Sequence, residues 1–99
     1  MEPVELREYR QLRYRILING QFRLQETTEY RALASAFLGY INGIHDPVTQ
    51  TVMMLFYQYV CSDVQIADRT HYSVSQVKRI KKSALDDLRK NNETKKPGS

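Results

Sequence analysis

Four basic side chains lie within five positions in the last quarter of the chain, and their chemistry is that of anion binding. They are Lys78, Arg79, Lys81 and Lys82. The positive excess of the 99-residue chain, a formal net charge of +4, falls entirely in residues 51–99, since residues 1–50 carry equal numbers of basic and acidic side chains. Such a patch attracts polyanions over about 8–10 Å at physiological salt. A basic string is also typical of a solvated helix face, so the surrounding elements decide between these interpretations.

Other chemistry has little support in the sequence. It contains no nucleophile–base pair, no paired acids and no glycine-rich phosphate loop, so we expect that the protein is not an enzyme. His71 has no cysteine or second histidine at ligand spacing, and His45 only precedes a helix cap. We therefore expect neither a metal site nor a cofactor.

Cysteine usage and the lack of targeting segments indicate a compartment. The single cysteine, Cys61, cannot form an internal disulfide, which favours a reducing environment. No basic-then-apolar leader follows Met1, and no apolar run is long enough to cross a bilayer. We therefore expect a cytoplasmic protein with no membrane partner.

The elements that position the basic residues are predicted to be helices, because apolar side chains recur at a three-to-four spacing. The predicted fold class is all-α, with a single domain over residues 1–90 built as a small bundle of about five helices. Residues 91–99 contain no apolar side chain, so we expect a disordered tail there.

Three helices are expected before residue 62. The first starts at Pro3 and stops at Asn19-Gly20, the second starts near Thr27 or Thr28 and stops at Asn42-Gly43, and Asp46-Pro47 opens the third. Between the first two helices, Phe22 and Leu24 alternate with polar neighbours, which leaves a short extended segment open.

Residues 62–90 are predicted to form a helix-turn-helix. Ser62 caps a short helix from Asp63 to Arg69, and Ser73 caps a longer one from Val74 to about Lys90. Two helices joined by only three residues must cross steeply. His71 stands where glycine is usual, so we expect a positive φ at this histidine. The side chains expected to be buried in the unit are Ile66, Ala67, Tyr72, Val77 and Ile80.

The second helix of this pair, residues 74–90, is predicted to have an inward and an outward face. At about 100° per residue, Val74, Val77, Lys81, Ala84, Leu85 and Leu88 fall in one half. Ser75, Arg79, Lys82, Ser83 and Asp86 fall in the opposite half, with Gln76 and Lys78 on its flanks.

The outward face suits a recognition helix in the major groove of DNA. Arginine forms bidentate hydrogen bonds with guanine, glutamine can bind adenine, and serine and lysine reach phosphates. We expect base contacts from Ser75, Gln76 and Arg79, and phosphate contacts from Arg69, Lys78, Lys81 and Lys82. The helix N-terminus with Ser73 is expected to hold a further phosphate.

Residues 40–88 carry a family resemblance. The motifs are Y-I-N-G-I-x-D-P (40–47), V-M-M-L-x-Y-x-Y-V (52–60), D-x-x-I-A (63–67) and Y-S-V-S-x-V-K-R-x-K-K (72–82). This stretch resembles the phage-encoded late transcription regulators of the ArpU and RinA type. The resemblance implies a helix-turn-helix similar to region four of bacterial sigma factors. It also implies promoter DNA as ligand, activation of phage or prophage packaging and lysis genes, and a cytoplasmic location in the bacterial host.

Two other functions stay open at this point. One is a small terminase subunit that binds a packaging site on DNA as a ring of many copies, whereas a regulator is expected as a monomer or homodimer. The other is an adaptor that contacts RNA polymerase or another regulatory protein. Such an adaptor would use aromatic side chains on its surface, for which the candidates are Tyr9, Tyr14, Tyr30, Phe37 and Tyr40.

Overall fold

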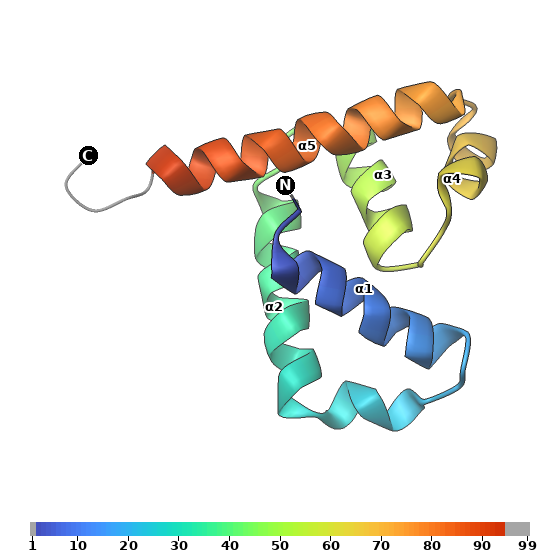
Figure 1. The fold of residues 1–99 in the computed structure, drawn as a ribbon, viewed down its shortest axis with the longest axis vertical. Coiled ribbons are helices and arrows are strands. Elements are labelled where there is room, and N and C mark those ends of the chain that lie inside the picture. Colours follow the sequence, from blue (N-terminus) through green and yellow to red (C-terminus); the bar gives the residue numbers. More distant parts are fainter. Residues whose placement is uncertain (1, 95–99) are drawn as a thin grey trace.

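The computed structural model describes the backbone of residues 2–94 and the side chains of residues 2–88. In this part of the chain there are five α-helices, one 3-10 helix and no strand, so the predicted all-α bundle is confirmed (Figure 1). The elements are α1 (Val4–Leu17), η1 (Phe22–Glu26), α2 (Thr28–Asn42), α3 (Pro47–Tyr57), α4 (Asp63–Thr70) and α5 (Val74–Thr94).

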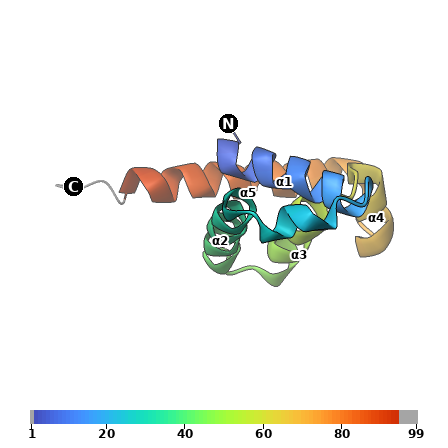
Figure 2. The same cartoon turned by 90° about the horizontal axis from the view of Figure 1, so that it is seen from below.

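The long helix α5 runs along one edge of the bundle, and α3 and α4 pack against its first half (Figure 1). Helix α1 packs against α2 and α3. Turned by 90°, the molecule shows α1 and α5 along the same side, with α2 and α3 on the other side (Figure 2). The two helices with the most arginine and lysine residues therefore share one face of the molecule.

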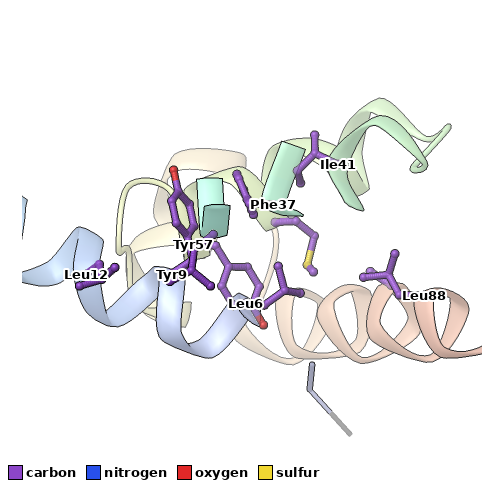
Figure 3. Close-up of a cluster of buried hydrophobic side chains, with 10 residues drawn as sticks. Leu6, Tyr9, Leu12, Phe37, Ile41, Tyr57 and Leu88 are labelled. Carbon is purple, nitrogen blue, oxygen red and sulfur yellow. The ribbon is translucent and has the colours of Figure 1, made fainter. Parts of the chain in front are cut away.

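A first hydrophobic core joins α1, α2, α3 and the middle of α5 (Figure 3). The Tyr9 ring stacks on Phe37, with ring centroids 4.8 Å apart, and Phe37 in turn lies 6.2 Å from Tyr57. This aromatic row ties the first three helices together. The buried members of the core are Leu6, Tyr9, Leu12, Leu33, Phe37, Ile41, Met53, Tyr57, Ala84 and Leu88.

Two arginines of α1 bind the carboxyl-terminal end of α3 through backbone carbonyl groups. Arg13, only 7% exposed, donates from Nε to the Gln58 carbonyl (2.8 Å) and from Nη1 to the Tyr30 hydroxyl (3.2 Å). Arg10 donates to the carbonyls of Phe56 (2.9 Å) and Cys61 (3.3 Å). The last carbonyls of a helix lack intrahelical donors and carry partial negative charge. Two guanidinium groups at this end supply hydrogen bonds to the carbonyls and compensate the charge.

The chain between α1 and α2 is not the short extended segment that the sequence allowed. Residues 22–26 form a single turn of 3-10 helix, with the Leu24 N–H bonded to the Gln21 carbonyl and the Thr27 N–H to the Leu24 carbonyl. Gly20 adopts a φ of 71°, which reverses the chain immediately after α1. The Thr27 hydroxyl then caps α2 by accepting from the Tyr30 N–H.

The last helix extends further than expected. The sequence placed its end near Lys90 and a disordered tail from 91 onward, yet the described backbone stays helical through Thr94. Asn91, Asn92 and Glu93 are tolerated in helices, and the first helix breakers after residue 74 are Pro97 and Gly98. The rest of the predicted tail, 95–99, lies outside the described residues. No helix in the described part of the chain has the length and apolar character needed to cross a bilayer.

The buried tyrosines predict a loss of stability at alkaline pH. Burial, together with a hydrogen bond to Tyr30, raises the pKa of Tyr9 above the ordinary value near 10. Burial and a hydrogen bond to Glu2 raise the pKa of Tyr57 in the same way. Above about pH 10 the unfolded chain loses these protons while the folded chain retains them, so the free energy of unfolding falls as pH rises. Urea unfolding followed between about pH 8 and pH 11 should show the midpoint falling above about pH 10.

The exposed Tyr14 provides the control for this prediction. Tyr14→Phe should leave the alkaline loss as large as in the parent protein, whereas Tyr57→Phe should make it smaller. A midpoint that stays constant up to about pH 11 would contradict the assignment of Tyr9 and Tyr57 as the groups responsible.

Candidate nucleic-acid interface

Reciprocal capping hydrogen bonds fix where α4 and α5 begin. Ser62 Oγ accepts from the Gln65 N–H (3.2 Å) while Gln65 Oε1 accepts from the Ser62 N–H (2.8 Å). Ser73 and Gln76 repeat the arrangement at the start of α5, at 3.1 and 2.9 Å. Each pair satisfies two otherwise orphaned backbone donors. Both serine caps therefore hold the helices where the sequence placed them.

The turn between the two helices bends at His71. This residue adopts φ 63° and ψ 19°, the left-handed conformation expected from its position. Histidine is one of the few non-glycine residues enriched in this region, although its Cβ still makes the conformation costly. The left-handed residue ends α4 and leaves only His71, Tyr72 and Ser73 before α5 begins.

Replacing His71 with glycine is expected to raise the free energy of unfolding by about 0.5–1 kcal/mol, because glycine adopts positive φ without a Cβ penalty. The His71 side chain is exposed, so little packing is lost. His71→Ala should have the opposite effect, since alanine keeps the Cβ and is rarer at positive φ. Urea denaturation measures both changes, and an alanine variant as stable as the glycine variant would refute the explanation.

A second hydrophobic core sets the crossing of α4 over α5. Its buried members are Val52, Cys61, Ile66 and Val77. The five side chains predicted to be buried in this unit all belong to it, with Ala67, Tyr72 and Ile80 packed partly buried around Ile66 and Val77. Helix α3 supplies Val52, so α4 and the first half of α5 rest on α3 as one unit.

The outward side of α5 carries an exposed basic face. The side chains of Lys78, Arg79 and Lys82 are exposed, and none of them has an ion pair or hydrogen bond with another side chain that the structure describes. Ser75 and Gln76 are also exposed in the first turn of the helix. We call Ser75, Lys78, Arg79 and Lys82 the α5 basic face.

Lys81 lies apart from this face. Its ammonium forms an ion pair with Asp63 (2.5 Å) and sits 3.7 Å from the centre of the Phe56 ring. Its side chain is only 16% exposed. Since it falls on the inward half of the helical wheel, its charge serves to join α5 to α3 and α4. We therefore leave Lys81 out of the phosphate contacts proposed below.

The remaining predicted site residues have mixed positions. Gln76 and Ser73 are engaged with one another in the capping pair, although both are exposed. Arg69 is exposed in the last turn of α4, beside a shallow cavity of about 330 Å³ shared with Pro47 and Tyr72. Arg69 is therefore at the neighbouring helix end rather than on the α5 basic face.

Acidic side chains limit the basic face on the side toward the end of α5. Asp86 and Asp87 are exposed one turn beyond Lys82. A carboxylate there repels anions, so the exposed positive surface ends after about the first three turns of α5.

The arginines of α1 form a basic surface that was not predicted from the sequence. Arg7, Arg10 and Arg15 line a cavity of about 550 Å³ together with Tyr14 and Phe56. The spacing signals only Arg7 and Arg10, which lie three residues apart on one flank, because Arg15 follows Glu8 by two turns and shares its side of the helix. Among the described residues there is no group of three histidine, cysteine or acidic side chains that could hold a metal ion.

Comparison with known proteins adds no assignment to this geometry. The chain matches no family model, no curated protein and no solved structure.

Proposed function

We propose that the protein is a sequence-specific DNA-binding transcription regulator, in which α4, the turn at residues 71–73 and α5 act as a helix-turn-helix. The observation that carries the proposal is the exposure of three cations, Lys78, Arg79 and Lys82, within the first three turns of α5, none of them with a partner among the described side chains. Unpaired cations on a rigid helix are available to phosphates and base edges without first breaking an internal contact.

Arg79 is the residue proposed to read sequence. It lies at the middle of the outward side of α5, where a helix lying in the major groove is closest to the bases. Its guanidinium has no partner among the described side chains, so it can donate two parallel hydrogen bonds to guanine. Ser75, one turn earlier on the same side, is placed to contact a base or a phosphate.

The phosphate contacts are proposed to come from the flanks of α5 and from α4. Lys78 and Lys82 extend beside Arg79, and Arg69 adds a cation at the end of α4. The capping pair uses the N–H groups of Ser73 and Gln76, so the N–H groups of Val74 and Ser75 are the ones left to favour a phosphate at the turn. Gln76 Oε1 is occupied by the Ser73 N–H (2.9 Å), which leaves its amide group to donate a single bond to a base.

The biological role that we propose is regulation of phage or prophage late genes, which rests on the resemblance of residues 40–88 to the ArpU and RinA type of regulator. The terminase alternative predicts a ring of many copies, so the mass in solution separates the two. The adaptor alternative is weakened because Tyr9 and Phe37, two of its five aromatic candidates, are buried in the first core.

Selection of bound duplexes from a random DNA pool, at about 50 and 200 mM salt, tests the proposal. We expect a short enriched motif that contains guanine, and affinity that falls steeply with salt. Lys78→Gln combined with Lys82→Gln should weaken binding to all sequences alike. Failure to bind any duplex at the lower salt concentration would overturn the proposal and favour the adaptor.

A further inference from the structure

Three arginines of α1 line one cavity, although Arg15 follows Glu8 by two helical turns and lies on the same side of the helix as Glu8. Arg7 and Arg10 lie on the flank that borders α3, next to Tyr14, whereas Glu5 and Glu8 lie toward the other flank. We call Arg7, Arg10 and Arg15 the α1 arginine edge, since all three line the 550 Å³ cavity beside Phe56. A cluster of cations gives its part of the surface a distinct potential, which attracts anions.

The guanidinium groups of this edge keep donors available. Arg10 uses Nε and Nη2 for the carbonyls of Phe56 and Cys61, which leaves three of its five N–H donors. Arg15 uses Nε for Gln21 Oε1 (3.0 Å), and Arg7 is exposed with no partner among the described side chains. Glu2 also lines the cavity, but its carboxylate accepts the hydrogen bond of the Tyr57 hydroxyl.

The Phe56 ring connects this edge to α5. The Arg10 guanidinium carbon lies 4.1 Å from the ring centre and the Lys81 ammonium lies 3.7 Å from it, so one aromatic side chain of α3 holds a cation from each of the two helices. Lys78 lies one turn before Lys81 on the same flank of α5, and it is exposed. Phe56 therefore links α1 to α5 at this point, while the Lys81 charge itself is paired with Asp63.

The two helices that carry these cations lie on one side of the fold. Figure 2 shows α1 and α5 along the same side of the molecule, with α2 and α3 on the other. A duplex bound to α5 that extends past Lys78 toward Phe56 would approach the side of the molecule on which α1 lies. The contact requires no rearrangement, because Arg10 is already held by two carbonyls and an aromatic ring.

We propose that the α1 arginine edge is a second phosphate-binding surface, which extends the DNA contact beyond the helix-turn-helix to the flanking backbone. The inference rests on the proposed DNA-binding function. Arginine suits this task because its planar fork donates paired hydrogen bonds to phosphate oxygens. The α1 edge adds affinity that depends on salt and carries no sequence preference, since its partners are phosphates.

The test compares two double variants that remove the same charge. Arg7→Gln with Arg15→Gln removes two cations of the edge, and Arg23→Gln with Arg31→Gln removes two exposed cations of η1 and α2. Binding to one selected duplex is measured across a salt series, with helical content checked by circular dichroism. We expect the first variant to lose about tenfold in affinity and to reduce the slope of log K against log salt by about 2. The control variant should keep the parent slope.

Three outcomes decide the matter. Reduced slope in the edge variant alone, with an unchanged enriched motif, supports the second surface. Equal slopes in the two variants, with the parent protein binding DNA normally, would refute the second surface and leave the helix-turn-helix proposal standing. No DNA binding by the parent protein at about 50 mM salt would overturn both.

Discussion

Replacing Arg13 with alanine is expected to lower the free energy of unfolding by about 3 kcal/mol, because the change removes a buried guanidinium and leaves two partly buried acceptors without their donor. Arg13 supplies the bonds to the Gln58 carbonyl and the Tyr30 hydroxyl, at 2.8 and 3.2 Å. Hydrogen bonds from charged donors contribute about 1.5–3 kcal/mol each, and the arginine stem adds packing. In a domain of this size each kcal/mol moves the melting temperature by roughly 4–8 °C, so the variant should melt more than about 10 °C lower.

Arg31 provides the matched control, since it is an exposed arginine in α2. Arg31→Ala should change stability by no more than about 0.5 kcal/mol, as is usual for surface substitutions. Arg13→Lys keeps the charge but lacks the fork that reaches two acceptors, so it should lie between the parent and the alanine variant. An Arg13→Ala variant as stable as Arg31→Ala would show that the bonds to α3 contribute little.

Replacing Arg79 with alanine is expected to weaken binding to the selected DNA site by about 10- to 100-fold, which corresponds to about 1–3 kcal/mol. The loss of affinity should be largest for the duplex that carries guanine at the contacted position. It should be smaller for duplexes with another base at that position. Fluorescence anisotropy with the selected duplex and with single-base variants measures both effects.

Lys82→Ala is the control for Arg79, because both side chains are exposed on the same helix side and neither has a described partner. It should weaken the selected site and its single-base variants by the same factor. The free energy of unfolding of both alanine variants should lie within about 0.5 kcal/mol of that of the parent protein. If Arg79→Ala bound every duplex as the parent does, the assignment of the reading side chain would be wrong.

The sequence predicted the boundaries of the helices wherever a local signal was present. Asp46-Pro47, Ser62 and Ser73 each start a helix as expected, and Asp46 accepts hydrogen bonds from the Thr49 hydroxyl and N–H, at 2.7 and 3.2 Å. The hydroxyl bond from Thr49 is the main reason that the pKa of Asp46 is lowered. The positive φ of His71 was likewise predicted from its position in the turn. These features depend on residues within about four positions of one another, so the sequence alone contains them.

Features that depend on contacts between distant helices were not predictable in the same way. The helical wheel placed Lys81 on the inward half but could not supply Phe56 and Asp63 as its partners. In the sequence of α1, Arg10 and Arg13 stand next to apolar residues. Only the packing of α1 on α3 brings their guanidinium groups to backbone carbonyls. Carbonyl acceptors are common to every residue, so no side-chain pattern marks them in advance.

The attachment of α1 to the end of α3 has a consequence for synthesis of the protein. Arg13 is synthesised before its acceptor at Gln58, which follows 45 residues later. At about 5–20 residues per second, the nascent helix waits several seconds on the ribosome before its guanidinium can find a carbonyl. A polypeptide interrupted before Gln58 would lack this closure, so such fragments should stay open to proteases and be degraded rather than accumulate.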